Sequence, residues 1–132
     1  MTQIEMDARA ASSTGLDPSF AGALAYLAGP FSGIIVLLAE QTNQYVRFHA
    51  WQAIIALGGL GLFAVALLLC AFLGLFVSPV LFKTLYVSSA IAAFVWLVVW
   101  AVCLVKAYGG SVWKLPLVGN LAERVASRPR AK

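Results

Sequence analysis

Three long apolar stretches separated by short polar runs dominate the pattern of this chain. They cover residues 20–39, 51–76 and 85–105, and none of them contains a charged side chain. About 20 apolar residues are needed to cross a hydrocarbon core of ~30 Å as a helix. The pattern therefore predicts an all-α integral membrane protein with three transmembrane helices in a domain over 20–108. A flexible tail over 1–19 precedes this domain, and a basic tail over 109–132 follows it.

Small residues recur at every fourth position of the first apolar stretch, a spacing that places them on one face of a helix. They are Ala21, Ala25, Gly29 and Gly33. Such a face lets two helix backbones approach closely in lipid, so we interpret it as a helix-packing face. Pro30 cannot donate to the carbonyl of Tyr26, which predicts a kink at Gly29-Pro30. The alternative for this stretch is a re-entrant hairpin that turns at the same two residues.

A polar run over 40–52 separates the first two apolar stretches and contains the only histidine of the chain. Thr42 or Asn43 can cap a helix that continues into the second stretch. On that helix Tyr45, His49 and Gln52 follow i, i+4, i+7 spacing, and we call them the polar stripe. One interpretation is that the stripe enters the bundle, to bond with another helix or to line a polar entrance. The other is that it lies in the headgroup layer and anchors the helix.

The last segment combines an amphipathic pattern with basic charge. Val118, Leu121, Ala122 and Val125 follow helical spacing, and Pro116 stands near the start of the predicted helix. This predicts a short amphipathic surface helix, with a disordered tail as the alternative. Lys and Arg near an anionic membrane surface are worth about 1 kcal/mol each. The tail is therefore a candidate for contact with anionic lipid.

Composition supports the membrane interpretation, and charge placement orients the chain. Of its 132 residues 62% are hydrophobic and 11% are charged, against about 25% charged in soluble domains. Lys and Arg favour the cytoplasmic side of short loops. With three spans, the side of the central loop and the C-terminal tail holds Arg47, Lys106, Lys114, Arg124, Arg128, Arg130 and Lys132, and the other side holds Arg9 and Lys83. This predicts a multi-pass protein of the bacterial cytoplasmic (inner) membrane, with the C-terminus inside and the N-terminus outside.

The apolar stretches offer little for catalysis. None of them contains Asp, Glu or His, whereas intramembrane hydrolysis or proton-coupled transport relies on such groups. Cys70 and Cys103 have no zinc-like spacing, and three spans would place them in opposite leaflets, too far apart for a disulfide. We therefore expect no enzyme activity, no cofactor, no metal and no nucleic-acid partner.

Four short segments carry a family resemblance. They read Ala25-Tyr26-Leu27-Ala28-Gly29-Pro30, Gly33-Ile34-Ile35, Val46-Arg47-Phe48-His49-Ala50-Trp51-Gln52 and Lys114-Leu115-Pro116-Leu117-Val118-Gly119. Together they resemble the Tic-twenty-like superfamily of small bacterial membrane proteins over residues 24–123. That superfamily is similar to the inner-envelope subunit of the chloroplast import translocon and includes the magnetosome protein MamF and its relatives. The matching motif positions are Arg47, Phe48, His49, Ala50, Gln52, Leu115 and Pro116.

The resemblance implies two kinds of role. Plastid members are linked to protein translocation and magnetosome members to biomineral size and organisation, while most bacterial members have no assigned activity. Together with the helix-packing face of the first apolar stretch, this favours a non-enzymatic scaffold or subunit that assembles with copies of itself or with other membrane proteins. The alternative is an oligomeric pore or translocation component. It requires oligomers because a three-span monomer is too thin to enclose an aqueous path.

Overall fold

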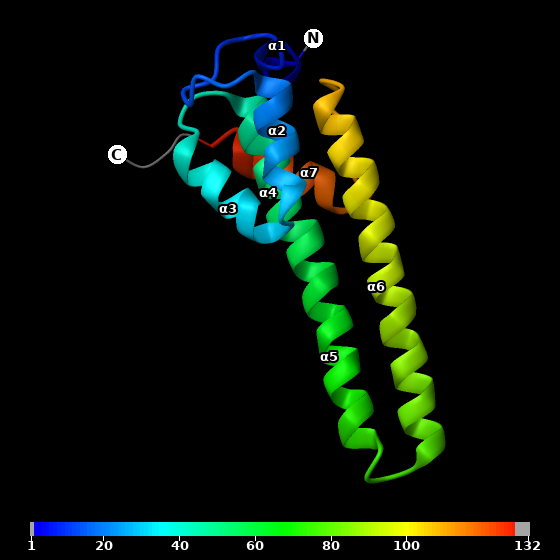
Figure 1. The fold of residues 1–132 in the computed structure, drawn as a ribbon. Helices are drawn as coiled ribbons and strands as arrows, with labels where there is room; N and C mark the ends of the chain where they lie inside the picture. Colours follow the sequence, from blue (N-terminus) through cyan, green and yellow to red (C-terminus); the bar gives the residue numbers. More distant parts are fainter. Residues whose placement is uncertain (1, 129–132) are drawn as a thin grey trace.

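The computed structural model describes residues 2–128, and its regular elements there are all helical (Figure 1). In chain order they are α1 (Gln3–Asp7), α2 (Pro18–Leu27), α3 (Pro30–Ala39), α4 (Gln44–Gln52), the π-helical turn η1 (Ala53–Leu57), α5 (Gly58–Gly74), α6 (Pro79–Tyr108) and α7 (Val118–Ala126). This confirms the all-helical class and the short C-terminal helix.

Two long helices form a stem. One runs without a break from Gln44 to Gly74 through α4, η1 and α5, and the other is α6; both are long and apolar enough to cross a membrane. They pack antiparallel around a turn in which Ser78 caps α6 by accepting from the N–H of Val80 at 3.2 Å. At 1.5 Å per residue each is about 45 Å long, so each exceeds a hydrocarbon core of ~30 Å.

The first apolar stretch is not the single helix that its length predicted. It forms two ten-residue helices, α2 and α3, which pack against each other as a hairpin (Figure 1). Gly29 adopts a φ of 64°, a left-handed conformation that glycine tolerates, and Pro30 starts α3. Ser32 Oγ ties the turn, accepting from Ala28 N and donating to Ala25 O, both at 2.9 Å. The prediction of a continuous helix over 20–39 is therefore wrong, and the structure has two candidate spans plus an apolar hairpin.

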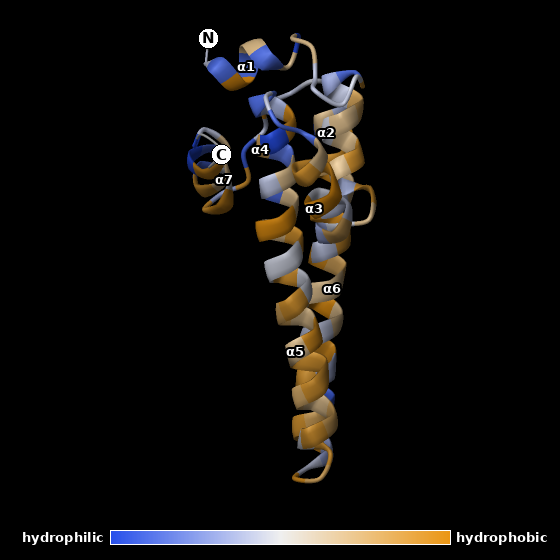
Figure 2. Ribbon diagram, turned by 90° about the vertical axis from the view of Figure 1, so that its left-hand side faces the viewer, coloured by the Kyte–Doolittle hydropathy of each residue, from blue (hydrophilic) through white to orange (hydrophobic). Residues whose placement is uncertain are grey.

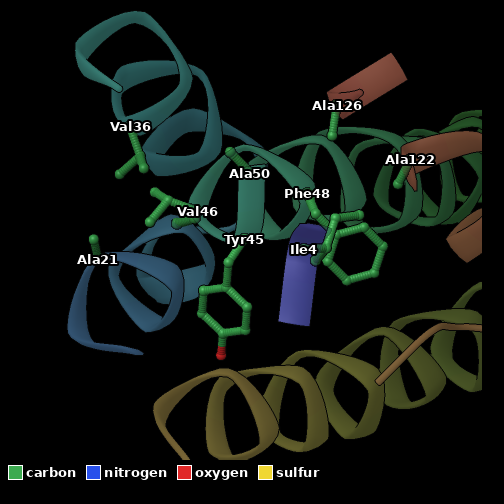
Figure 3. Packing of buried hydrophobic residues seen from close by; sticks show 10 residues of the cluster. Ile4, Ala21, Val36, Tyr45, Val46, Phe48, Ala50, Ala122 and Ala126 are labelled. Atoms are coloured by element: carbon green, nitrogen blue, oxygen red, sulfur yellow. The ribbon is translucent and has the colours of Figure 1, made fainter. Parts of the chain in front are cut away.

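The remaining helices, α1, α2, α3 and α7, gather at one end of the stem around α4 and the C-terminal end of α6 (Figures 1 and 2). We call this end, with α4 and the end of α6 included, the head. Its apolar core is centred on α4, from which Val46, Phe48 and Ala50 project (Figure 3). Side chains from four other helices close around them: Ile4, Ala21, Val36, Ala122 and Ala126. The stem below is mainly apolar, with pale segments of intermediate hydropathy between the apolar ones (Figure 2).

Both ends of the described chain lie at the head. Ile4 of α1 is buried in the core, and the carboxylate of Asp7 accepts from the N–H of Gln44 at 2.8 Å. Because α1 and α7 both pack on α4, the N-terminal segment is a docked element. Both described ends therefore lie at the same end of the stem, whereas three spans would place them at opposite ends. Arg9 thus joins the basic residues of the head, while Lys83 lies near the far turn; Arg130 and Lys132 fall outside the described residues.

Gly33 tests the packing of the hairpin on α4. A Cβ at this position would lie 3.0 Å from the carbonyl oxygen of Ala50 and 3.2 Å from Ala53 Cβ. Gly33→Leu is therefore expected to lower the free energy of unfolding by about 2 kcal/mol, the usual cost of overpacking. Gly59→Leu is the matched control, because a Cβ there meets nothing within 4 Å. Thermal unfolding in detergent, followed by circular dichroism, compares the two; equal midpoints would contradict the packing.

Candidate functional site

A chain of buried polar side chains runs through the centre of the head. His49 Nε2 lies 3.1 Å from the carbonyl oxygen of Ser111, which can only accept, so Nε2 carries the proton. His49 Nδ1 then accepts from the Tyr26 hydroxyl at 2.9 Å, and that hydroxyl accepts from Gln52 Nε2 at 3.0 Å. All three side chains are at most 1% exposed. The imidazole of His49 and the hydroxyl of Tyr26 are thus each used once as donor and once as acceptor.

The polar stripe predicted on α4 faces inward and holds the segment that follows α6. Tyr45 donates to the carbonyl oxygen of Ala107, in the last turn of α6, at 2.6 Å. Gln52 both donates to the carbonyl of Trp113 at 3.1 Å and accepts from the N–H of Leu115 at 3.2 Å. Residues 111–117 have no regular structure of their own, so these side chains replace the backbone partners that a helix would supply.

The small residues that were predicted to form a helix-packing face, here called the small-residue stripe, pack against other helices of the same chain. Ala21 and Ala25 are buried in the head core, and Gly33 faces α4. Gly29 lies against α6, where a Cβ would come within 3.2 Å of the Trp96 ring. The stripe is thus distributed over α2, the turn and α3, and it packs on α4 and α6 of this chain.

The motif residues that carry the family resemblance come together although about 60 positions separate their two halves. Arg47 Nη2 donates to the carbonyl of Arg128 at 3.3 Å, and Phe48 belongs to the core that includes α7. Leu115 bonds to Gln52, and the carbonyl of Pro116 accepts from Val118 N at 2.8 Å. The two halves of the motif therefore form one contact, in which α4 packs against the segment that leads into α7.

Glu40 forms a second polar cluster, which the sequence analysis did not identify. Its carboxylate is buried and accepts from Ser12 Oγ, from Ser13 Oγ at 2.6 Å and from the N–H of Asn43 at 2.9 Å. Burial acts to raise the pKa of this carboxyl, but the hydrogen bonds from Asn43, Ser12, Ser13 and Thr42 outweigh it and lower the pKa to about 2. Glu40 thus joins the N-terminal segment to the start of α4 as a carboxylate.

Three aromatic residues of the head were also missed. Tyr26 was overlooked as a partner of the polar stripe, although it is the one tyrosine in the first apolar stretch. Trp100 donates to the Tyr26 carbonyl at 2.7 Å, and Trp96 donates to the carbonyl of Leu57, at the end of η1, at 2.8 Å. These bonds fix the hairpin and the π-helical turn to α6. Within residues 2–128 no three His, Cys, Asp or Glu side chains come together as a candidate metal site.

An apolar stem, an exposed apolar hairpin and a head with an internally satisfied polar core define a small helical membrane protein. The chain belongs to the MamF/MmsF family, described as the magnetosome magnetite crystal formation protein family, whose model matches residues 13–122. This confirms the part of the predicted resemblance that concerns MamF and its relatives.

Curated relatives support the same class. A UPF0132 membrane protein of Archaeoglobus fulgidus is 38% identical over 104 residues, covering 79% of this chain and 90% of the relative. A UPF0132 membrane protein of Methanocaldococcus jannaschii, MJ1443, is 38% identical over 112 residues, covering 85% and 91%. Both relatives are archaeal, so the likeness extends beyond the bacterial proteins of the predicted resemblance. No solved structure matches the chain.

Proposed function

We propose that this protein is a non-enzymatic structural subunit of a membrane complex, with the stem crossing the bilayer and the head embedded in one leaflet and its interface. The α2–α3 hairpin supports this placement, since apolar side chains point away from the head along it. Leu27, Phe31, Ile35 and Leu38 are all more than half exposed. A pair of ten-residue helices, each about 15 Å long, reaches halfway through a core of ~30 Å as a re-entrant element.

The observation that carries the proposal is the closure of the polar core. Tyr45, His49 and Gln52 bond to partners in the same chain and are shielded from solvent. A pore lining needs polar groups that face water. In this chain the three polar side chains instead bond to other parts of the head and hold it together. The apolar faces of α5 and α6 remain for lipid or for neighbouring subunits, which favours a scaffold over the alternative of an oligomeric pore or translocation component.

The orientation follows from the basic residues. In residues 2–128 the head carries Arg9, Arg47, Lys106, Lys114, Arg124 and Arg128, and Lys83 is near the opposite turn. By the positive-inside rule, this distribution supports a placement of the head, with both ends of the described chain, at the cytoplasmic face of the cytoplasmic membrane. The same side lets the basic C-terminal segment contact anionic lipid.

The assembly itself is tested by mass. We expect the purified protein in lipid nanodiscs to have a defined mass above that of one 14.0 kDa chain, as measured by mass photometry or by light scattering with lipid and detergent subtracted. A monomer at all protein concentrations would contradict the subunit proposal.

The native Cys103 reports whether water reaches the polar core. It is 1% exposed and packs in one cluster with Tyr26. In a Cys70→Ser variant we expect Cys103 to resist a membrane-impermeant maleimide in intact assemblies and to react after denaturation. A Ser127→Cys variant that also carries Cys70→Ser and Cys103→Ala is the control, since residue 127 is exposed on the head and should react at once. Fast labelling of Cys103 in the intact protein would instead favour the pore.

A further inference from the structure

An apolar groove opens on the flank of the molecule where the stem meets the head. It lies between η1 and the start of α5 on one side, α6 on another, and the loop 115–118 at its upper end, and its volume is about 610 Å³. Ile55, Leu60, Val95 and Val99 supply its walls. In the proposed membrane placement, the groove faces the hydrocarbon core of the bilayer.

Gly59 keeps the groove open. A Cβ at Gly59 would meet nothing within 4 Å, whereas one at Gly58 would meet Pro30 at 3.4 Å and one at Gly61 would meet Trp96 at 3.2 Å. The other two glycines thus permit packing of helices within the chain, and Gly59 borders space that the chain itself does not fill.

The upper border of the groove combines apolar and cationic side chains in a fixed order. Leu117 is 95% exposed and has a φ of 70°, a conformation that costs a residue with a Cβ about 1 kcal/mol or more. Leu121 and Arg124 are exposed on α7, and exposed Arg128 follows the end of that helix at Ala126. Along the chain the exposed side chains are therefore apolar beside the groove and cationic farther away, which matches the order of acyl chain and phosphate in a phospholipid.

We propose that this groove binds one acyl chain of an anionic phospholipid, whose phosphate is held by Arg124 at the border of the head. The proposal rests on the membrane placement given above. Charge selects the occupant: residues 53–105 contain Lys83 as their single charged side chain, so the stem of a second copy has no anion for Arg124. Glu123 is already paired with Lys114, which leaves the guanidinium of Arg124 for a phosphate.

Photo-crosslinking tests the site. The probe is phosphatidylglycerol with a diazirine on its acyl chain, present at low fraction in phosphatidylcholine nanodiscs that contain the full chain. We expect crosslinks concentrated on residues 55–60 and 95–99 in the wild type and lost from them in Gly59→Leu. Ala66→Leu is the matched control, because residue 66 is exposed on the same face of α5 two turns below the groove. Arg124→Gln should reduce crosslinking about fivefold, the effect of one cation at an anionic surface, whereas Lys83→Gln at the far turn should leave it unchanged.

The outcomes separate the lipid site from the membrane placement. Crosslinks spread evenly over the exposed faces of α5 and α6, and unchanged by Gly59→Leu, would overturn the site while leaving the placement intact. If the crosslinking yield in the groove is the same in Arg124→Gln as in the wild type, the choice of an anionic lipid is overturned. An absence of acyl crosslinks from the whole stem would overturn the membrane placement, and the lipid site with it. Retained helicity and elution volume show that each variant is folded.

Discussion

Replacing Gln52 by leucine is expected to lower the free energy of unfolding by about 4 kcal/mol, because two partly buried backbone groups lose their partners at about 2 kcal/mol each. The groups are the carbonyl of Trp113 and the N–H of Leu115. The Tyr26 hydroxyl also loses the donor that completes its hydrogen bonds. If the head lies partly in the bilayer, none of these groups can bond to water instead, so the loss of stability is not reduced by solvation.

Hydrogen exchange by mass spectrometry and thermal unfolding in nanodiscs measure this effect together. In Gln52→Leu we expect faster exchange over residues 111–118, because the side chain that holds this segment is gone. Ser88→Ala is the control, since Ser88 is only partly buried and its side chain bonds within its own helix, to the Thr84 carbonyl at 2.9 Å. If Gln52→Leu unfolds and exchanges like the wild type, the segment is held in another way and the polar core does not organise the head.

The second large effect concerns Glu40 and pH. Because the pKa of this buried carboxyl is lowered to about 2 in the folded protein, the folded state binds the proton more weakly than the unfolded state does. The stabilisation is therefore complete above the unfolded pKa of 4.5 and is lost as the pH falls from there towards 2. Its full size is about 3 kcal/mol, from a shift of roughly 2.5 pKa units at 1.36 kcal/mol each.

Glu40→Gln removes both the charge and its titration. We expect this variant to be less stable than the wild type at neutral pH and to approach it in stability near pH 2.5. Glu123→Gln is the control, because the ion pair of Glu123 with Lys114 is partly exposed and worth at most about 1 kcal/mol. Chemical denaturation between pH 2.5 and 7 gives the comparison. Parallel curves for wild type and Glu40→Gln would show that Glu40 does not anchor the N-terminal segment as a carboxylate.

The helical class was predictable because long apolar runs without charge have few other folds. The hairpin was harder to predict. The four-residue spacing of small side chains continues across the turn, in Ala21, Ala25, Gly29 and Gly33. This regular spacing favoured a continuous helix over the alternative of a turn at Gly29-Pro30. The decisive features are the positive φ of Gly29 and the bonds of Ser32 across the turn, and neither has a period that a sequence pattern reveals.

The polar core was predictable only in part. The spacing of Tyr45, His49 and Gln52 showed that one face of α4 is polar, but it left open whether that face meets protein or the headgroup layer. Most of the partners are backbone groups of residues 107–115, and a backbone carbonyl has no signature in the sequence. Tyr26 becomes a partner only because the hairpin brings α2 against α4, so its role depends on the fold.

The location of the two chain ends tests the central claim most directly. In a variant with Cys70→Ser and Cys103→Ala, single cysteines are placed at Thr14, Ser127 and Ser78, and each is labelled with an impermeant maleimide in sealed vesicles of known orientation. The hairpin account predicts that positions 14 and 127 react from the same, cytoplasmic side and that position 78 reacts from the opposite side. Labelling of positions 14 and 127 from opposite sides would contradict it, and would restore a first helix that crosses the membrane.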